Sequence, residues 1–69
     1  MADWKFPETL KELRKERGIG QVQLAEQIGV SNAIVSMWEN GLREPTMSSL
    51  IKLSEFFGVT IDYLVGKSK

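Results

Sequence analysis

Apolar residues recur along the chain at spacings of three and four, the period of an amphipathic helix. They form short segments, each followed by a glycine, and a glycine after such a segment is a common helix stop. These glycines are Gly18, Gly29, Gly41, Gly58 and Gly66. No segment alternates apolar and polar residues as a half-buried strand does. The pattern therefore predicts an all-α fold of five short helices, at about residues 7–17, 21–28, 32–40, 47–57 and 61–65.

Residues suited to helix starts stand where this pattern needs them. Pro7 favours the first turn of a helix, because its fixed backbone angle fits there and it has no N–H to leave unpaired. The hydroxyls of Ser31, Thr46 and Thr60 can accept hydrogen bonds from free N–H groups of the next turn. Gly20 offers no such cap, so we expect a weaker start for the second helix.

Two helices have apolar stripes that we expect to face the core. The stripe of the first helix is Phe6, Leu10, Leu13 and Arg17, and that of the fourth is Met47, Leu50, Leu53 and Phe57.

Length and composition limit what this chain can do. With 69 residues, 42% of them hydrophobic, we expect one compact domain over residues 1–69. The absence of cysteine and histidine excludes disulfides, His- or Cys-ligated zinc and histidine acid–base catalysis. No nucleophile stands beside a base and no metal-ligand spacing occurs, so we expect no enzyme activity, no cofactor, no metal and no small-molecule substrate.

The charge and the apolar segments bear on location and partners. Nine basic residues balance nine acidic ones, which is less basic than many nucleic-acid-binding domains. The amino terminus lacks a basic region followed by an apolar one, and no apolar run approaches the roughly 20 residues that span a bilayer. We therefore expect a cytoplasmic protein without membrane contact.

Residues 21–40 meet the requirements of two short helices that cross at a sharp angle. Ala25 is a small residue where the helices would touch, and Gly29 suits a tight turn between them. The apolar residues that would hold the angle are Leu24, Ile28, Val30, Val35 and Trp38.

The stretch QVQLAEQIGVSNAIVSMWENG resembles the helix-turn-helix of lambda-repressor-like or Cro-like (Xre-type) regulators. Its flanks LKELRKERG, REPTMSSLIKLSEFFGV and TIDYLVG resemble the first, fourth and fifth helices of that family, so the likeness extends from Leu10 to Gly66. The resemblance implies a compact five-helix domain that binds double-stranded DNA sequence-specifically. It also implies a transcriptional regulator of bacterial or phage type, and we expect a repressor.

The resemblance assigns roles to particular residues, with the third helix lying in the major groove. The residues expected to contact base edges are Asn32, Ala33, Ser36 and Met37. Those expected at the DNA backbone are Gln21, Ile34, Asn40, Gly41 and Arg43, and Arg14 with Glu39 would form a charge pair orienting the third helix.

Family members usually bind palindromic operators as dimers, so we expect a homodimer, including one that forms only on DNA. The candidate contacts are Phe56, Ile61, Leu64 and Val65.

Two residues depart from the family pattern. Ile34 and Met37 are apolar where polar residues are common, and such side chains can contact thymine methyl groups. They also suit an alternative function, a protein-interaction or antitoxin-like module on the same fold that uses the apolar face of the third helix.

Overall fold

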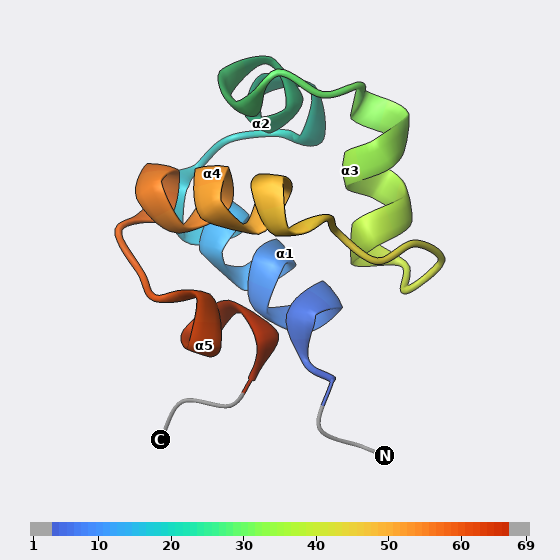
Figure 1. The fold of residues 1–69 in the computed structure, drawn as a ribbon. Coiled ribbons are helices and arrows are strands. Elements are labelled where there is room, and N and C mark those ends of the chain that lie inside the picture. The colour runs from blue at the N-terminus through green and yellow to red at the C-terminus, as the bar shows by residue number, and fades with distance from the viewer. Residues whose placement is uncertain (1–3, 67–69) are drawn as a thin grey trace.

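The computed structural model describes residues 4–66, and residues 1–3 and 67–69 of the expected domain lie outside this part of the chain. Five helices follow in order: α1 (Phe6–Arg17), α2 (Gln21–Ile28), α3 (Asn32–Glu39), α4 (Met47–Phe57) and α5 (Ile61–Val65) (Figure 1). The described residues contain no strand, so the predicted all-α class is confirmed. Compared with the prediction, α1 begins one residue earlier and α3 ends one residue earlier. At the end of α3 the N–H of Gly41 bonds the carbonyl of Trp38 at 3.2 Å, a tighter turn that closes the helix.

The helix starts have the caps that the sequence predicts. Ser31, Thr46 and Thr60 each accept a hydrogen bond from the backbone N–H three residues later, at 3.2, 3.1 and 3.0 Å. At Gly20, which has no side chain to offer, the Oε1 atom of Gln23 accepts the Gly20 N–H at 2.7 Å. This contact supplies one half of a capping box and strengthens an otherwise weak start.

Every helix contributes to one apolar core, and Trp38 is its largest fully buried side chain, with 2% of its surface exposed. The Phe6 ring meets the Trp38 ring edge-on, with centroids 6.0 Å apart. The other buried apolar residues are Leu10, Leu24, Ala25, Ile28, Val35, Leu50, Leu53 and Leu64.

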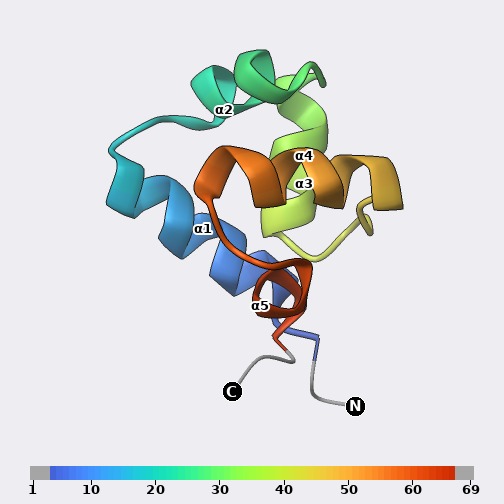
Figure 2. The ribbon, with the colours of Figure 1, turned by 60° about the vertical axis from the view of Figure 1, so that its left-hand side comes forward.

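The helix arrangement leaves one side of α3 uncovered. α3 packs against α1 and α2, while α4 packs against α2 and α5. Figure 1 shows α3 at the edge of the molecule, and Figure 2 shows it behind α4 with α1 below. A hydrogen bond of 3.3 Å from the N–H of Lys5 to the carbonyl of Val65 joins the start of α1 to the end of α5. No helix within residues 4–66 has the length and apolarity needed to cross a membrane.

The expected stripe of α4 is only partly correct. Leu50 and Leu53 are buried, Phe57 is half-buried, and Met47 is 62% exposed. Met47 is the first residue of α4, so its side chain lies beyond the part of the helix that the core covers. In α1, Phe6 and Leu10 are buried, whereas Arg17 is exposed.

Candidate nucleic-acid interface

The turn between α2 and α3 fixes how the two helices cross. Gly29 has φ of 76°, in the left-handed region that favours glycine. The N–H groups of Gly29 and Val30 both bond the carbonyl of Ala25, at 2.8 and 3.0 Å. Ala25 is 2% exposed, and its small side chain allows α2 and α3 to approach closely. The turn and the contact together set the crossing of α2 and α3.

The two sides of α3 differ in burial. Val35 and Trp38 are buried on its inner side. The four residues expected to contact bases have the spacing i, i+1, i+4 and i+5, which places them on one helix face. Of these four, Asn32 and Ala33 are exposed and Ser36 and Met37 are half-buried.

Ile34 lies between these two sides. Its side chain is half-buried against the core and lines a groove that Arg43, Glu44 and Ser49 also line. Its backbone N–H donates to the Ser31 hydroxyl at 3.2 Å and is therefore not free to donate to a phosphate. Ile34 adds less to the apolar outer face of α3 than the sequence suggested.

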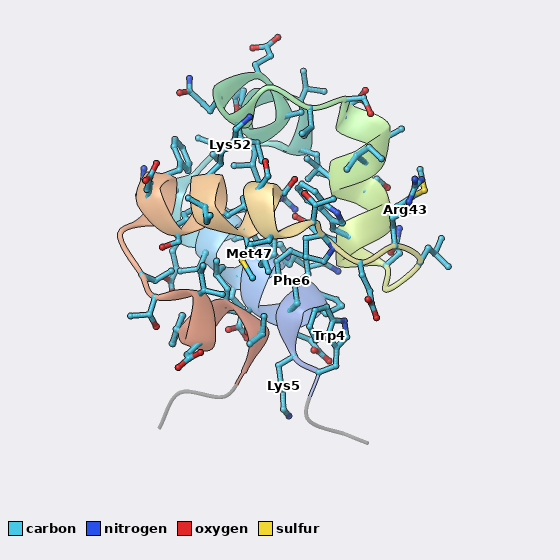
Figure 3. The ribbon with its side chains drawn as sticks, viewed as in Figure 1. Trp4, Lys5, Phe6, Arg43, Met47 and Lys52 are labelled. Atoms are coloured by element: carbon cyan, nitrogen blue, oxygen red, sulfur yellow. The ribbon has the colours of Figure 1, made fainter. Side chains whose placement is uncertain are left out.

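The other residues expected at the DNA backbone lie at the two ends of the helix-turn-helix. Gln21 is the first residue of α2 and is half-buried. Asn40, Gly41 and Arg43 are exposed directly after α3, and Figure 3 shows Arg43 on the outer side of α3, away from Phe6 in the core. Asn40 Nδ2 lies 3.5 Å from Ser36 Oγ, at the upper limit of a hydrogen bond.

The expected pair of Arg14 and Glu39 is formed and largely buried. Arg14 Nε donates to Glu39 Oε2 at 2.7 Å and Arg14 Nη2 donates to Glu39 Oε1 at 3.0 Å. The exposed fractions of the two side chains are 12% for Arg14 and 1% for Glu39. The hydrogen bond with Glu39 raises the pKa of Arg14, and the charge of Glu39 raises it further against the effect of burial. Arg14 therefore remains charged and fixes the end of α3 to α1.

Gln21 is a third member of this cluster, and the sequence prediction missed it. Gln21 Nε2 donates to Glu39 Oε1 at 3.1 Å, although the residues are 18 positions apart. Glutamine at the start of a helix is usually solvated, so no local sequence signal indicated this contact.

The expected dimer contacts need one correction. Leu64 is fully buried, so it cannot contact a second molecule; it is the residue that anchors α5 to the core. Phe56, Ile61 and Val65 are half-buried and pack against the core.

On α4 and α5, three other apolar side chains are more exposed than these candidates. Met47, Ile51 and Tyr63 expose 62%, 44% and 45% of their surfaces. Met47 and Ile51 are one turn apart on α4, and Tyr63 is on α5, which packs against that helix. We call these three residues the α4–α5 patch. Figure 3 shows Met47 beneath α4, on the side where α5 lies.

Metal binding is a separate question from DNA contact. Among residues 4–66, no three His, Cys, Asp or Glu side chains come together as a metal site requires.

Comparisons with known proteins agree with this geometry. Residues 10–64 match the sequence profile of a helix-turn-helix family. The chain is 48% identical over 61 residues to the HTH-type transcriptional activator BcrR of Enterococcus faecalis, an alignment covering 88% of this chain and 30% of that protein.

Two solved structures share the fold. One is a transcriptional regulator from Listeria innocua, with a TM-score of 0.90, 34% identity and coverage of 97% of this chain and 63% of that one. The other is the P22 c2 repressor in complex with a synthetic operator, with a TM-score of 0.86, 33% identity and coverage of 91% and 96%. The chain thus spans 30% of its enterococcal relative but nearly all of the P22 repressor chain.

Proposed function

Because this chain belongs to the helix-turn-helix family and has the lambda-repressor-like fold, we propose that it is a transcriptional regulator that binds double-stranded DNA through α3. The observation that carries the proposal is the asymmetry of α3. Its inner side is held by Val35 and Trp38, while Asn32 and Ala33 are exposed on a face that no other helix covers. A helix with one free face, which carries Asn32, Ser36 and the apolar Ala33 and Met37, fits the major groove of B-DNA.

In this proposal α3 contacts base edges and its flanks contact phosphates. Asn32 can pair bidentately with adenine, the hydroxyl of Ser36 can bond several bases, and Ala33 and Met37 suit thymine methyl groups. The phosphate contacts come from the side chains of Gln21, Asn40 and Arg43 and from the backbone at Gly41. Ile34 lies beside the phosphates as an apolar contact.

The size of the molecule supports binding as a homodimer on a palindromic operator. Its longest dimension is 29 Å, whereas equivalent major-groove faces of B-DNA are separated by about 34 Å. A single copy carries one α3 and so occupies one half-site. We propose that two copies meet through the α4–α5 patch and the neighbouring α5 residues Ile61 and Val65. Phe56 lies on the other side of α4, beside Arg17 and α2, and is not part of this contact. The two copies need to contact each other only when both are bound to the operator.

Occupying an operator within a promoter excludes polymerase, so we propose repression as the regulatory outcome and the bacterial cytoplasm as its place. The enterococcal relative is named an activator, and operator binding is the step that both modes of regulation share. The position of the operator relative to the promoter distinguishes them.

Selection of bound sequences from random duplex DNA tests the proposal. We expect enrichment of a palindrome whose two halves are one helical turn apart. If no duplex is enriched while a protein partner is captured through Met37 and Ala33, the chain is instead a protein-interaction or antitoxin-like module.

A further inference from the structure

The Gln21 side chain at the start of α2 is held from within the protein. Its Nε2 atom donates to Glu39 Oε1 at 3.1 Å, and the same oxygen accepts Arg14 Nη2 at 3.0 Å. The other oxygen of Glu39 accepts Arg14 Nε at 2.7 Å. With only 1% of its side chain exposed, Glu39 is a fixed acceptor and not a mobile surface carboxylate.

This contact determines which way the Gln21 amide is turned. An ionised carboxylate only accepts hydrogen bonds, so the nitrogen of the amide and not its oxygen must face Glu39. Glu39 uses one of the two hydrogens on Nε2 and leaves the second for an external acceptor. A solvated glutamine would instead sample many rotamers, and ordering them on binding would weaken the interaction.

Arg14 makes this arrangement compatible with DNA. A lone carboxylate near the start of α2 would repel a phosphate, but the two hydrogen bonds from Arg14 balance its charge. The third bond of Arg14, from Nη1 to the carbonyl of Ile19 at 3.0 Å, holds the turn that leads into α2. One buried carboxylate thereby connects α1, the start of α2 and the end of α3.

We propose that Glu39 is a positioning residue for DNA-backbone binding: it fixes the Gln21 amide so that the second N–H of Nε2 is available to a phosphate oxygen. The proposal rests on the proposed function. It assigns Glu39 a role beyond its ion pair with Arg14. In this role Glu39 does not contact DNA, but it orients the Gln21 amide that does.

The first arm of the test uses the free protein and needs no DNA. Side-chain amide NMR compares Gln21 with Gln27, which is exposed on the same helix. We expect a rigid Gln21 amide with one hydrogen slow to exchange, a mobile Gln27 amide, and loss of the difference in Glu39→Gln. Equal mobility of the two amides in the wild type overturns the proposal.

The second arm is a double-mutant cycle on affinity for the selected operator, corrected for the folded fraction of each variant. We expect Gln21→Ala to weaken binding about tenfold, as the loss of a hydrogen bond to a charged group does. In Glu39→Gln the single amide oxygen is taken by the Arg14 cation, so Gln21 loses its acceptor and affinity also falls. With Gln21→Ala already present, Glu39→Gln should weaken binding much less than it does in the wild type, because only its contact with Arg14 is then changed. Fully additive losses overturn the proposal.

Two conservative substitutions test the proposal if Glu39→Gln does not fold. In Gln21→Asn the amide is one methylene shorter and cannot reach both Glu39 and a phosphate, so affinity should fall as in Gln21→Ala. The matched control Gln27→Asn should bind like the wild type. Unchanged affinity in Gln21→Asn contradicts the proposal, whereas absence of any operator binding by the wild type contradicts the proposed function and leaves the NMR arm to decide the role of Glu39.

Discussion

Arg17 at the end of α1 lies over the ring of Phe56 near the end of α4, with its guanidinium carbon 4.7 Å from the ring centroid. Its Nη2 atom donates to the backbone carbonyl of Phe56 at 2.9 Å. The ring of Phe57 lies 5.4 Å from the same carbon and meets Phe56 edge-on. Arg17 therefore covers aromatic surface and satisfies a carbonyl that the end of α4 leaves unpaired.

We expect Arg17→Ala to lower the free energy of unfolding by about 1 kcal/mol, because it removes an exposed cation–π contact and a hydrogen bond together. Arg17→Lys should lose about half as much, since an ammonium group keeps the charge but not the planar stacking. Urea denaturation measures both variants. Lys15→Ala, on an exposed position of the same helix, is the control and should change stability by less than about 0.5 kcal/mol. Equal midpoints for Arg17→Ala and the control would show that the contact contributes nothing.

Trp38 should be the most costly core residue to truncate. Removing its side chain leaves a cavity against Phe6, and such substitutions cost about 3 to 5 kcal/mol. That is close to the whole stability expected of a domain this small, so Trp38→Ala should be largely unfolded at room temperature. Trp4→Ala removes the same side chain at a position 45% exposed and should retain a cooperative melt by circular dichroism. A near-native melting temperature for Trp38→Ala would contradict the burial of this residue.

Local signals in the sequence predicted the helices well. Caps such as Ser31, Thr46 and Thr60 act on the next turn, so the residue and its effect lie within a few positions. Helical periodicity, by contrast, identifies a stripe but not how far along the helix other elements cover it. For this reason Met47 was expected in the core and is exposed. Leu64 was expected at a dimer surface from the family resemblance, which does not show which side of α5 faces the core, and it is buried.

In the candidate site, too, local features could be predicted from the sequence and long-range contacts could not. The burial of Val35 and Trp38 could be predicted because both follow the period of α3. The contact of Gln21 with Glu39 could not, because it depends on how the start of α2 lies against the end of α3, 18 residues later.

Charge at the α4–α5 patch should separate dimer contact from DNA contact. We expect Met47→Glu to weaken binding to the full palindrome by about tenfold, because two facing carboxylates would repel each other and bury charge. Affinity for an isolated half-site should stay unchanged. Trp4→Glu introduces the same charge at an exposed apolar residue outside the patch and serves as the control. Gel-shift titrations on full and half operators measure the difference, and equal losses on both would locate Met47 at the DNA instead.

Arg43 and Glu44 are neighbours of opposite charge on the groove beside α3, and they should affect salt dependence in opposite directions. Arg43→Ala removes one phosphate contact, so affinity should fall for all sequences alike and the slope of log K against log salt should flatten by about one. Glu44→Gln removes a repulsion and should strengthen binding, most of all at low salt. Affinity measurements over a salt series test both. A slope that neither variant changes would place this loop away from the phosphates.

The base preference should follow from the apolar side chains on α3. Ala33 is exposed and Met37 half-buried on the outer face, and neither offers a hydrogen bond. Thymine alone presents a methyl group in the major groove, so we expect thymines opposite these residues and an adenine opposite Asn32. Replacing each such thymine by uracil removes only the methyl group. Binding should fall by about 0.8 kcal/mol per methyl, or roughly fourfold, in a competition assay on otherwise identical duplexes.

Two comparisons make this prediction specific. Uracil placed outside the half-site should leave affinity unchanged, which controls for any general effect of uracil on duplex shape. Met37→Gln should lose its sensitivity to uracil at one position and change the preferred base there, because a carboxamide can donate to and accept from a base edge. The fold should be kept, since residue 37 lies on the outer face of α3 and the core residues Val35 and Trp38 are untouched. If uracil within the half-site has no effect while the thymines are still selected, the preference arises from the deformability of the duplex and not from methyl contacts with α3.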